Sequence, residues 1–311
     1  MKLLLAALVA VACAAAQESP DKTVFRTGVS LVHVDAEAVS QDGRVVGGLT
    51  KQDFRVFDDN KEQPIVEFAA EDQPLDLILL FDISGSMNMV VQKVSSAAHQ
   101  AFRALRPGDR VSVMVFNTRS RVVSPFSDDL DHVERVISED VLGLSFGGGT
   151  LIQEAVDDAA RRFSDEKRSE RRRAVLIVTD NMGQRTRRDE PIIEDFWDAD
   201  ALLSGLIVDN PAEVAMHGVA VIMNPARLAM EAGMTGIAQK TGGDTVHASD
   251  PAGAFEAALR RIRARYSLYY ALPQAKPGTK REIRVELAPD AAKQYPKTKI
   301  KARSGYIVPN A

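Results

Sequence analysis

Hydrophobic and polar positions follow different periods in different parts of the chain. Between residues 24 and 70, apolar and polar residues alternate in short runs at 29–34, 54–57 and 64–68, and the runs are separated by turn signals such as Asp42-Gly43. Alternation with period two, broken by turns, is typical of half-buried strands. We therefore expect an N-terminal β module over residues 17–71.

The pattern changes from about residue 72 to residue 266. The runs 75–81 and 174–179 are almost entirely apolar, as in strands buried on both faces. Residues 202–208 fit either a strand or the end of a helix. Other strands are expected at 110–116, 121–126, 218–223 and 245–247, and helices at 90–105, 130–137, 150–163 and 253–265. The alternation predicts an α/β domain with a doubly wound, mostly parallel sheet over 72–266.

The C-terminal segment returns to strand patterns, at 267–272, 281–287 and 299–308. Neither this segment nor the N-terminal module has enough strands for a stable core. We expect residues 267–311 to pack with 17–71 as one β-sandwich that the α/β domain interrupts.

The first 16 residues read as a secretory signal peptide. Lys2 precedes the apolar run 3–13, and Ala14 to Ala16 supply the small residues of a cleavage site. Two alternatives are a buried N-terminal helix and a lipid anchor at Cys13, the single cysteine of the chain. No later run reaches the ~18 apolar residues of a membrane span, so we expect an exported protein, periplasmic or extracellular.

Composition changes this picture little. Apolar residues make up 45% and charged residues 26% of the chain, as in soluble globular proteins. The formal net charge of −4 argues against nucleic acid as a partner, because such partners require a basic surface. A local basic run at 161–173 is expected to be a solvated helix end and loop, with a site for an anionic partner as the alternative.

Three separated segments carry the chemistry. Asp82, Ser84 and Ser86 follow the first apolar strand, Thr150 follows Gly147-Gly148-Gly149, and Asp180 ends the second apolar strand. In open α/β sheets, ligands bind outside the carboxyl ends of the strands. The sequence therefore predicts that two carboxylates and three hydroxyls meet at one edge of the sheet.

Oxygen donors without thiol or imidazole favour hard cations, which here means Mg²⁺ with Mn²⁺ and Ca²⁺ as alternatives. Two acids and three neutral hydroxyls leave such an ion electrophilic. Mg²⁺ usually retains several waters, so a coordination position is open to a carboxylate from a partner.

This arrangement resembles the metal-ion-dependent adhesion site of von Willebrand factor A-type domains. The D-x-S-x-S motif of that family matches Asp82, Ser84 and Ser86, and its loop threonine and strand-end aspartate match Thr150 and Asp180. The resemblance implies direct ligation by the hydroxyls and ligation through water by the aspartates. The family's usual T-D-G has Asn181 in place of glycine here, which puts the shape of that loop in doubt.

The flanking segments are similar to a group of exported A-domain proteins common in Acidobacteria. The matching features are residues 48–54 (GLTKQDF), Thr241-Gly242-Gly243 and Arg303 to Tyr306. This similarity implies export and a shared architecture, and it implies no particular activity.

Other candidates are weaker. The five histidines form no metal-binding pair, and neither serine lies in a G-x-S-x-G elbow, so no enzyme activity is expected. Met87 and Trp197 are candidate anchors for a partner, with core packing as the more ordinary interpretation.

The sequence thus predicts a module that binds a protein ligand through a cation and an Asp or Glu carboxylate. The alternative is a structural or assembly subunit of the cell envelope in which the metal only stabilises the fold.

Overall fold

The computed structural model describes residues 30–309, except for 71–72, 167–170, 184 and 209–233. The predicted signal peptide 1–16, Cys13 and the predicted strand 218–223 lie outside the described residues. In the part of the chain that is described, no helix is both long and apolar enough to cross a membrane.

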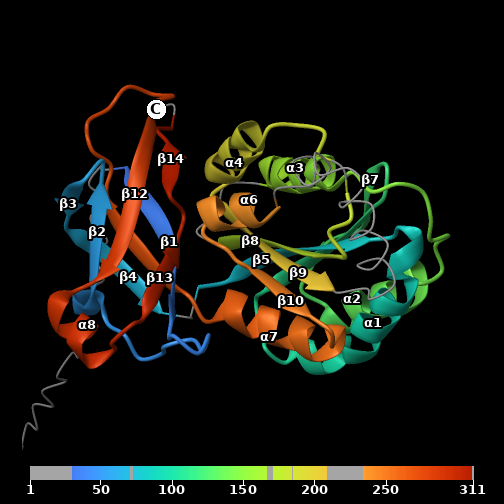
Figure 1. The fold of residues 1–311 in the computed structure, drawn as a ribbon. Helices are drawn as coiled ribbons and strands as arrows, with labels where there is room; N and C mark the ends of the chain where they lie inside the picture. Colours follow the sequence, from blue (N-terminus) through green and yellow to red (C-terminus); the bar gives the residue numbers. More distant parts are fainter. Residues whose placement is uncertain (1–29, 71–72, 167–170, 184, 209–233, 310–311) are drawn as a thin grey trace, which may run out of the picture. The chain divides into compact units, whose positions relative to one another are not determined.

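A six-stranded sheet forms the centre of the α/β domain (Figure 1). Its order is β10-β9-β8-β5-β6-β7, and every neighbouring pair is parallel except β6 with β7. All eight residues of β5 and of β8 are buried, which explains the apolar runs 77–81 and 174–178 within them. The strands are β5 (Leu75–Asp82), β6 (Arg110–Phe116), β7 (Ser120–Ser127), β8 (Arg172–Thr179), β9 (Ala201–Val208) and β10 (Thr245–Ala248).

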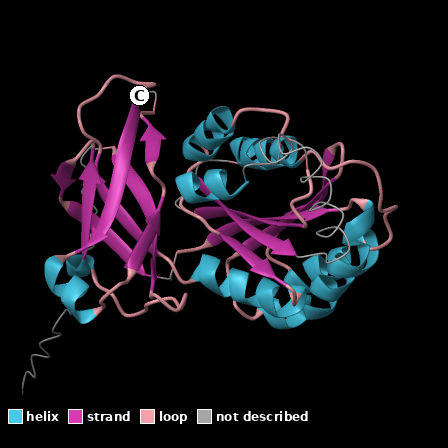
Figure 2. Ribbon diagram, viewed as in Figure 1, coloured by secondary structure: helices cyan, strands magenta, loops and turns pink. Residues whose placement is uncertain are grey.

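Helices cover both faces of this sheet (Figure 2). Because successive side chains of a strand point to opposite faces, Leu77 and Leu79 pack in one hydrophobic cluster and Ile78 and Leu80 in another. The first cluster includes α1 (Asn88–Phe102), α2 (Leu130–Arg135) and α7 (Pro251–Arg263), and the second includes α3 (Ile152–Arg162), α4 (Asp189–Asp198) and α6 (Met234–Thr241). The expected doubly wound fold is therefore confirmed, and 201–208 is a strand.

Short helical turns complete the α/β domain and the module beside it. Three are 3₁₀ turns and one is a π-helical turn that extends α2. They are Lys51–Asp53, Gly85–Met87, Phe163–Asp165 and Val136–Val141, and the short helix α8 spans Pro289–Gln294.

The N- and C-terminal segments pair with each other in two antiparallel four-stranded sheets. The first has the order β13-β1-β11-β4 and the second β14-β12-β2-β3, so each sheet contains strands from both ends of the chain. Their inner faces share one core that includes Val34, Phe54 and Tyr270. The strands are β1 (Leu31–Val39), β2 (Phe54–Asp58), β3 (Lys61–Gln63), β4 (Ile65–Ala70), β11 (Tyr266–Ala271), β12 (Lys280–Leu287), β13 (Lys299–Ala302) and β14 (Gly305–Ile307).

This pairing agrees with the expected sandwich, although the expected strand 299–308 is interrupted between β13 and β14. The boundaries 17–71, 72–266 and 267–311 remain predictions, because residues from Leu31 onward form one compact unit.

Two glycines explain motifs that stood out in the flanking sequence. Gly242 has a φ of 96°, and a Cβ there would lie 2.6 Å from the backbone nitrogen of Arg303. A Cβ on Gly305 would lie 2.7 Å from the Trp197 ring. Only glycine permits such close approach, so both motifs fit the contact between the α/β domain and the β module.

Candidate metal site

The two predicted aspartates reach the same edge of the sheet because β5 and β8 are parallel neighbours. Phe81 pairs with Val178, so Asp82 and Asp180 both lie at the carboxyl ends of these strands. Asp82 is fully buried and Asp180 is 8% exposed. The strand order alone therefore brings together carboxylates that are 98 positions apart in the chain.

The Asp82 carboxylate is held from two sides. The backbone amide of Ser84 donates to Oδ1 at 2.8 Å, and the hydroxyl of Thr179 donates to Oδ2 at 2.7 Å. Thr179 lies on the neighbouring strand and is fully buried. These two donors fix the orientation of the carboxylate.

Ser86 connects the first segment to the third. Its hydroxyl donates to Asp180 Oδ2 at 2.6 Å and lies 3.3 Å from the hydroxyl of Ser84. The structure thus brings Asp82, Ser84, Ser86 and Asp180 together, as the sequence predicted for these four residues.

Thr150 is placed nearby through its loop. The Gly147 amide donates to the Ile83 carbonyl at 2.9 Å, and the Asn117 side chain donates to the Gly147 carbonyl at 3.0 Å. The Thr150 hydroxyl forms no hydrogen bond with the other four residues in the described part of the chain. Helix α3 begins at Ile152, so the expectation that Thr150 opens this helix was wrong by two residues.

Asn181 takes over the role of the usual glycine. Its φ is 59°, a left-handed conformation that asparagine adopts more readily than other non-glycine residues. Its amide donates to the Thr179 hydroxyl at 3.0 Å, and the next amide, of Met182, donates to Asp180 Oδ1 at 3.1 Å. The departure from T-D-G therefore leaves the loop in a conformation that glycine would also adopt.

Burial raises the pKa of Asp82 to about 6. The hydrogen bonds from Ser84 and Thr179 oppose this rise, whereas the nearby charge of Asp180 adds to it. A cation beside the two carboxylates would offset both the loss of hydration and their mutual repulsion. The charge arrangement is therefore compatible with a bound cation.

The donor chemistry fits a hard divalent ion. The described residues contain no group of three or more His, Cys, Asp or Glu side chains able to hold a metal. Binding at this edge would thus depend on hydroxyls as well as on Asp82 and Asp180. Such an all-oxygen set suits Mg²⁺, Mn²⁺ or Ca²⁺.

The two candidate partner anchors are not available at this site. Met87 is fully buried in the cluster that contains α1, because its side chain points inward from the turn before that helix. Trp197 is the second-last residue of helix α4, which precedes β9, and the first residue of β9 pairs with Arg173 near the start of β8. Trp197 therefore lies at the opposite edge of the sheet, where its indole N–H donates to the Lys240 carbonyl at 3.0 Å.

Sequence reasoning missed Thr179 and Asn117. Thr179 is a polar residue directly after the apolar run 174–178, which was the available signal. Asn117 directly follows β6 and holds the glycine loop from the next strand end. Both support the site residues and are not themselves in the predicted ligand set.

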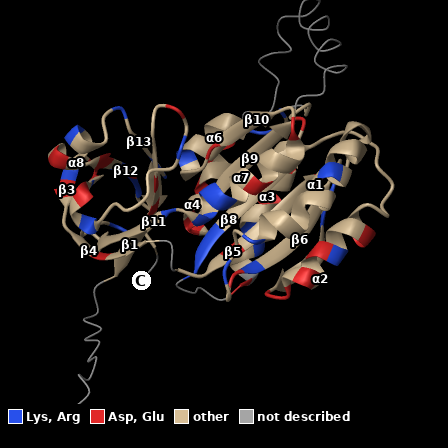
Figure 3. Cartoon of the chain, turned by 90° about the horizontal axis from the view of Figure 1, so that it is seen from below, with Lys and Arg blue, Asp and Glu red and all other residues tan. Residues whose placement is uncertain are grey.

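In the described part of the basic run at 161–173, Arg161 at the helix end is exposed as expected, but Arg172 and Arg173 are buried, contrary to expectation. Arg161 forms ion pairs with Asp157 and Asp195, at 2.9 and 3.0 Å. Arg172 and Arg173, which lie where β8 is blue in Figure 3, are 2% and 5% exposed. They donate to main-chain carbonyls, including that of Arg263 for Arg172. Buried guanidinium groups replace water with such partners, so these two arginines are structural.

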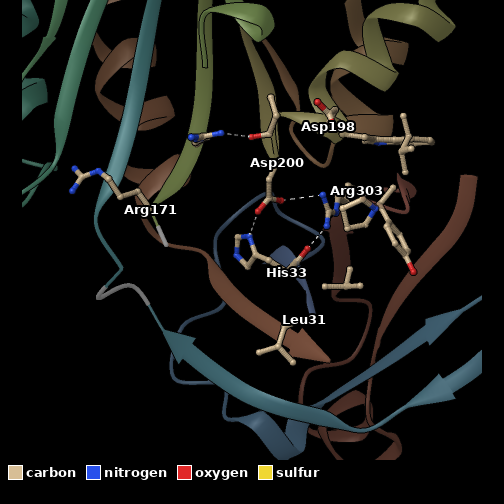
Figure 4. Close-up of a pocket in the computed structure, with 13 residues that line it drawn as sticks. Leu31, His33, Arg171, Asp198, Asp200 and Arg303 are labelled. Atoms are coloured by element: carbon tan, nitrogen blue, oxygen red, sulfur yellow. Dashed lines mark hydrogen bonds and ion pairs between the residues drawn. The ribbon is translucent and has the colours of Figure 1, made fainter. Parts of the chain in front are cut away.

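A hollow of about 170 Å³ lies at the opposite edge, where the β module meets the α/β domain (Figure 4). In it, Asp200 accepts hydrogen bonds from the His33 ring at 2.8 Å and from the Arg303 guanidinium at 3.0 Å. Burial alone would lower the pKa of His33, but the charges of Asp200 and Asp35 outweigh it and raise that pKa to about 10. His33 is therefore a cation that helps to join the two parts.

Comparison with known proteins identifies the domain that carries the site. The family model for the von Willebrand factor type A domain matches residues 77–184, which include all five predicted ligands. The chain is 29% identical over 113 residues to the E3 ubiquitin-protein ligase WAV3 of Arabidopsis thaliana. That alignment covers 36% of this chain and 15% of the relative.

Two solved structures are similar in fold at low sequence identity. A BatB protein from Bacteroides thetaiotaomicron is 18% identical with a TM-score of 0.47, and the match covers 60% of this chain and 97% of that one. A von Willebrand factor type A protein from Catenulispora acidiphila is 12% identical with a TM-score of 0.45, and the match covers 83% of this chain and 73% of that one. Residues 77–184 of this chain therefore match the von Willebrand factor type A domain family.

Proposed function

We propose that this chain is an exported protein-binding module whose partner contact depends on a divalent cation. Von Willebrand factor type A domains often mediate protein interactions and often bind a divalent metal. The observation that carries the proposal is the hydrogen-bonded convergence of Asp82, Ser84, Ser86 and Asp180 at the carboxyl edge of the sheet.

The residues have distinct roles in this proposal. Ser84, Ser86 and Thr150 ligate through their hydroxyls, and Asp82 and Asp180 orient metal-bound waters. Thr179 and the Ser84 amide hold Asp82 in place, so the donor set needs little rearrangement. A bound cation would supply an electrophilic centre for an Asp or Glu carboxylate of the partner.

The second candidate is a structural role, in which the cation only stabilises the strand ends. The full burial of Asp82 beside Asp180 favours it, because an unneutralised carboxylate there costs free energy. The two candidates differ in what metal removal does: a binding site loses its partner while the fold survives, whereas a structural site loses stability.

The test is a pull-down from envelope extract of the source cells in Mg²⁺ and in EDTA. Wild type is compared with Asp82→Ala and with the matched control Asp290→Ala, which removes an exposed aspartate of α8. We expect a partner retained in Mg²⁺ by wild type and the control, and lost in EDTA and with Asp82→Ala. Replacement of the partner's own acidic residues should then abolish retention.

The binding proposal fails if retention is unchanged in EDTA and in Asp82→Ala. Circular dichroism in EDTA separates the two candidates, since unfolding there would favour the structural role.

A further inference from the structure

Two exposed methionines lie beside the candidate metal site. Met89 is 61% exposed and Met182 is 39% exposed. The large hydrophobic side chains exposed to this extent in the described chain are Leu31, Val66, Met89, Val122 and Met182. Exposed large apolar side chains scattered singly are ordinary, but two of these five flank one hydrogen-bonded pair of candidate ligands.

The distances along the chain are short. Ser86 and Asp180 are joined by a hydrogen bond of 2.6 Å, Met89 follows Ser86 by three residues, and Met182 follows Asp180 by two. An extended chain advances at most ~3.6 Å per residue. The Cα of Met89 therefore lies within about 11 Å of the Cα of Ser86, and the Cα of Met182 lies within the same distance of the Cα of Asp180.

Core packing does not account for either side chain. Helix α1 buries Val91, Val94 and Ala98 against the sheet, whereas Met89 in its first turn faces solvent. The Met182 amide is fixed by its hydrogen bond to Asp180. Both side chains are thus exposed beside the site, where burial against an apolar surface of a partner would be favourable.

We propose that Met89 and Met182 form an apolar rim that contacts large apolar residues on either side of the partner's carboxylate. This inference rests on the proposed function. Methionine is flexible and polarisable, and it suits surfaces that adapt to varied apolar partners. The rim selects a partner segment with the pattern apolar, acidic, apolar.

The charges at the site favour a partner segment with a single acidic residue over a segment with several consecutive acidic residues. Asp82 and Asp180 already carry two negative charges, which equal the charge of a divalent ion, and the hydroxyls add none. One partner carboxylate completes the coordination, and a second acid beside it would meet an uncompensated negative charge and an apolar rim. Neutral apolar neighbours are therefore favoured.

The test uses fluorescein-labelled pentapeptides in Mg²⁺ and in EDTA, with affinity measured by fluorescence polarisation. The probes are Gly-Leu-Asp-Leu-Gly, Gly-Ser-Asp-Ser-Gly and Gly-Leu-Asn-Leu-Gly. The proteins are the full mature chain, the double variant Met89→Gln with Met182→Gln, and Val66→Thr. Val66 is a matched control because it is 45% exposed on β4 of the β module.

We expect wild type and Val66→Thr to bind the Leu-Asp-Leu probe about tenfold more tightly than the Ser-Asp-Ser probe, which corresponds to 1.4 kcal/mol. The double variant should bind both aspartate probes equally and retain its dependence on Mg²⁺. Glutamine is close to methionine in size and helix propensity, so its fold should survive.

Equal binding of the two aspartate probes by wild type, or an unchanged ratio in the double variant, overturns the apolar rim alone. If no probe binds in an Mg²⁺-dependent manner, or if the asparagine probe binds as well as the aspartate probe, the proposed function fails and the rim with it.

Discussion

The support that Thr179 gives to Asp82 can be tested with the substitution Thr179→Val, which replaces a hydroxyl with a methyl of similar size. The Thr179 side chain is fully buried, donates to Asp82 Oδ2 at 2.7 Å and accepts from the Asn181 amide at 3.0 Å. The variant keeps the volume and removes both hydrogen bonds.

The expected loss follows from these contacts. A hydrogen bond to a charged group contributes about 1.5–3 kcal/mol, and a buried group left unpaired costs about 1–3 kcal/mol. Asn181 is half-buried, so water can replace the Thr179 hydroxyl as the acceptor for its backbone amide, and the loss of this second hydrogen bond adds little to the destabilisation. We expect Thr179→Val to lower the free energy of unfolding by about 2–3 kcal/mol.

The assay is urea unfolding at pH 7.5 in EDTA, followed by circular dichroism, with Thr179→Ser as the control that keeps the hydroxyl. The serine variant should lose about 1 kcal/mol for the missing methyl group. A Thr179→Val variant as stable as wild type would refute the idea that this hydroxyl holds Asp82 in place.

Three other predictions concern the β module and its contact with the α/β domain. Asp58→Ala should destabilise by about 3–5 kcal/mol in thermal unfolding, because buried Asp58 accepts from Tyr270, Tyr306 and Arg281. A loss below 1 kcal/mol would contradict this role. The folded-state pKa of His33, about 10, is above the ordinary histidine pKa of 6.5, so the contribution of its ion pairs to stability is complete below pH 6.5 and disappears as pH rises through about 10. Urea unfolding across this range should show a steeper loss for wild type than for His33→Gln, and parallel curves would count against the ion pair. Residues 72–266 alone should give a cooperative unfolding transition whereas 17–71 alone should not, since β1 pairs with β11 and β13 from the C-terminal segment. A folded 17–71 fragment would show that the sandwich does not require both ends.

The sequence was most informative where burial is uniform. Strands β5 and β8 are buried at every residue, so their apolar runs marked them as central. Once they are parallel neighbours, Asp82 and Asp180 must share an edge. This geometry explains why residues far apart in the chain could be assigned to one candidate site before the structure.

Burial at the start of α1 could not be predicted from the sequence. Met87 and Met89 are two residues apart and look equivalent, yet Met87 is fully buried and Met89 is 61% exposed. The 3₁₀ turn over Gly85–Met87 sets the direction of Met87 before the α-helical period begins. Such a change of helical period leaves no mark in the hydrophobic pattern.

Long-range polar contacts could not be predicted from the sequence either. The run that contains Arg172 was expected to be solvated, because charged side chains are rarely buried without a partner. Arg172 is buried because its guanidinium donates to the main-chain carbonyls of Arg263 and Arg265, about 90 residues away in the chain. Main-chain acceptors carry no sequence signal, so this burial appears only in the fold.

The central claim is that the strand-end site binds a divalent cation, and the most direct test is a thermal-unfolding titration with Mg²⁺, Mn²⁺ and Ca²⁺. A cation bound only by the native state at a hundredfold excess over Kd stabilises it by about 2.7 kcal/mol. We predict an upward shift of the unfolding temperature for wild type and for Asp290→Ala, and no shift for Asp82→Ala. An unchanged unfolding temperature in wild type with all three cations would contradict the claim, as would an equal shift in Asp82→Ala.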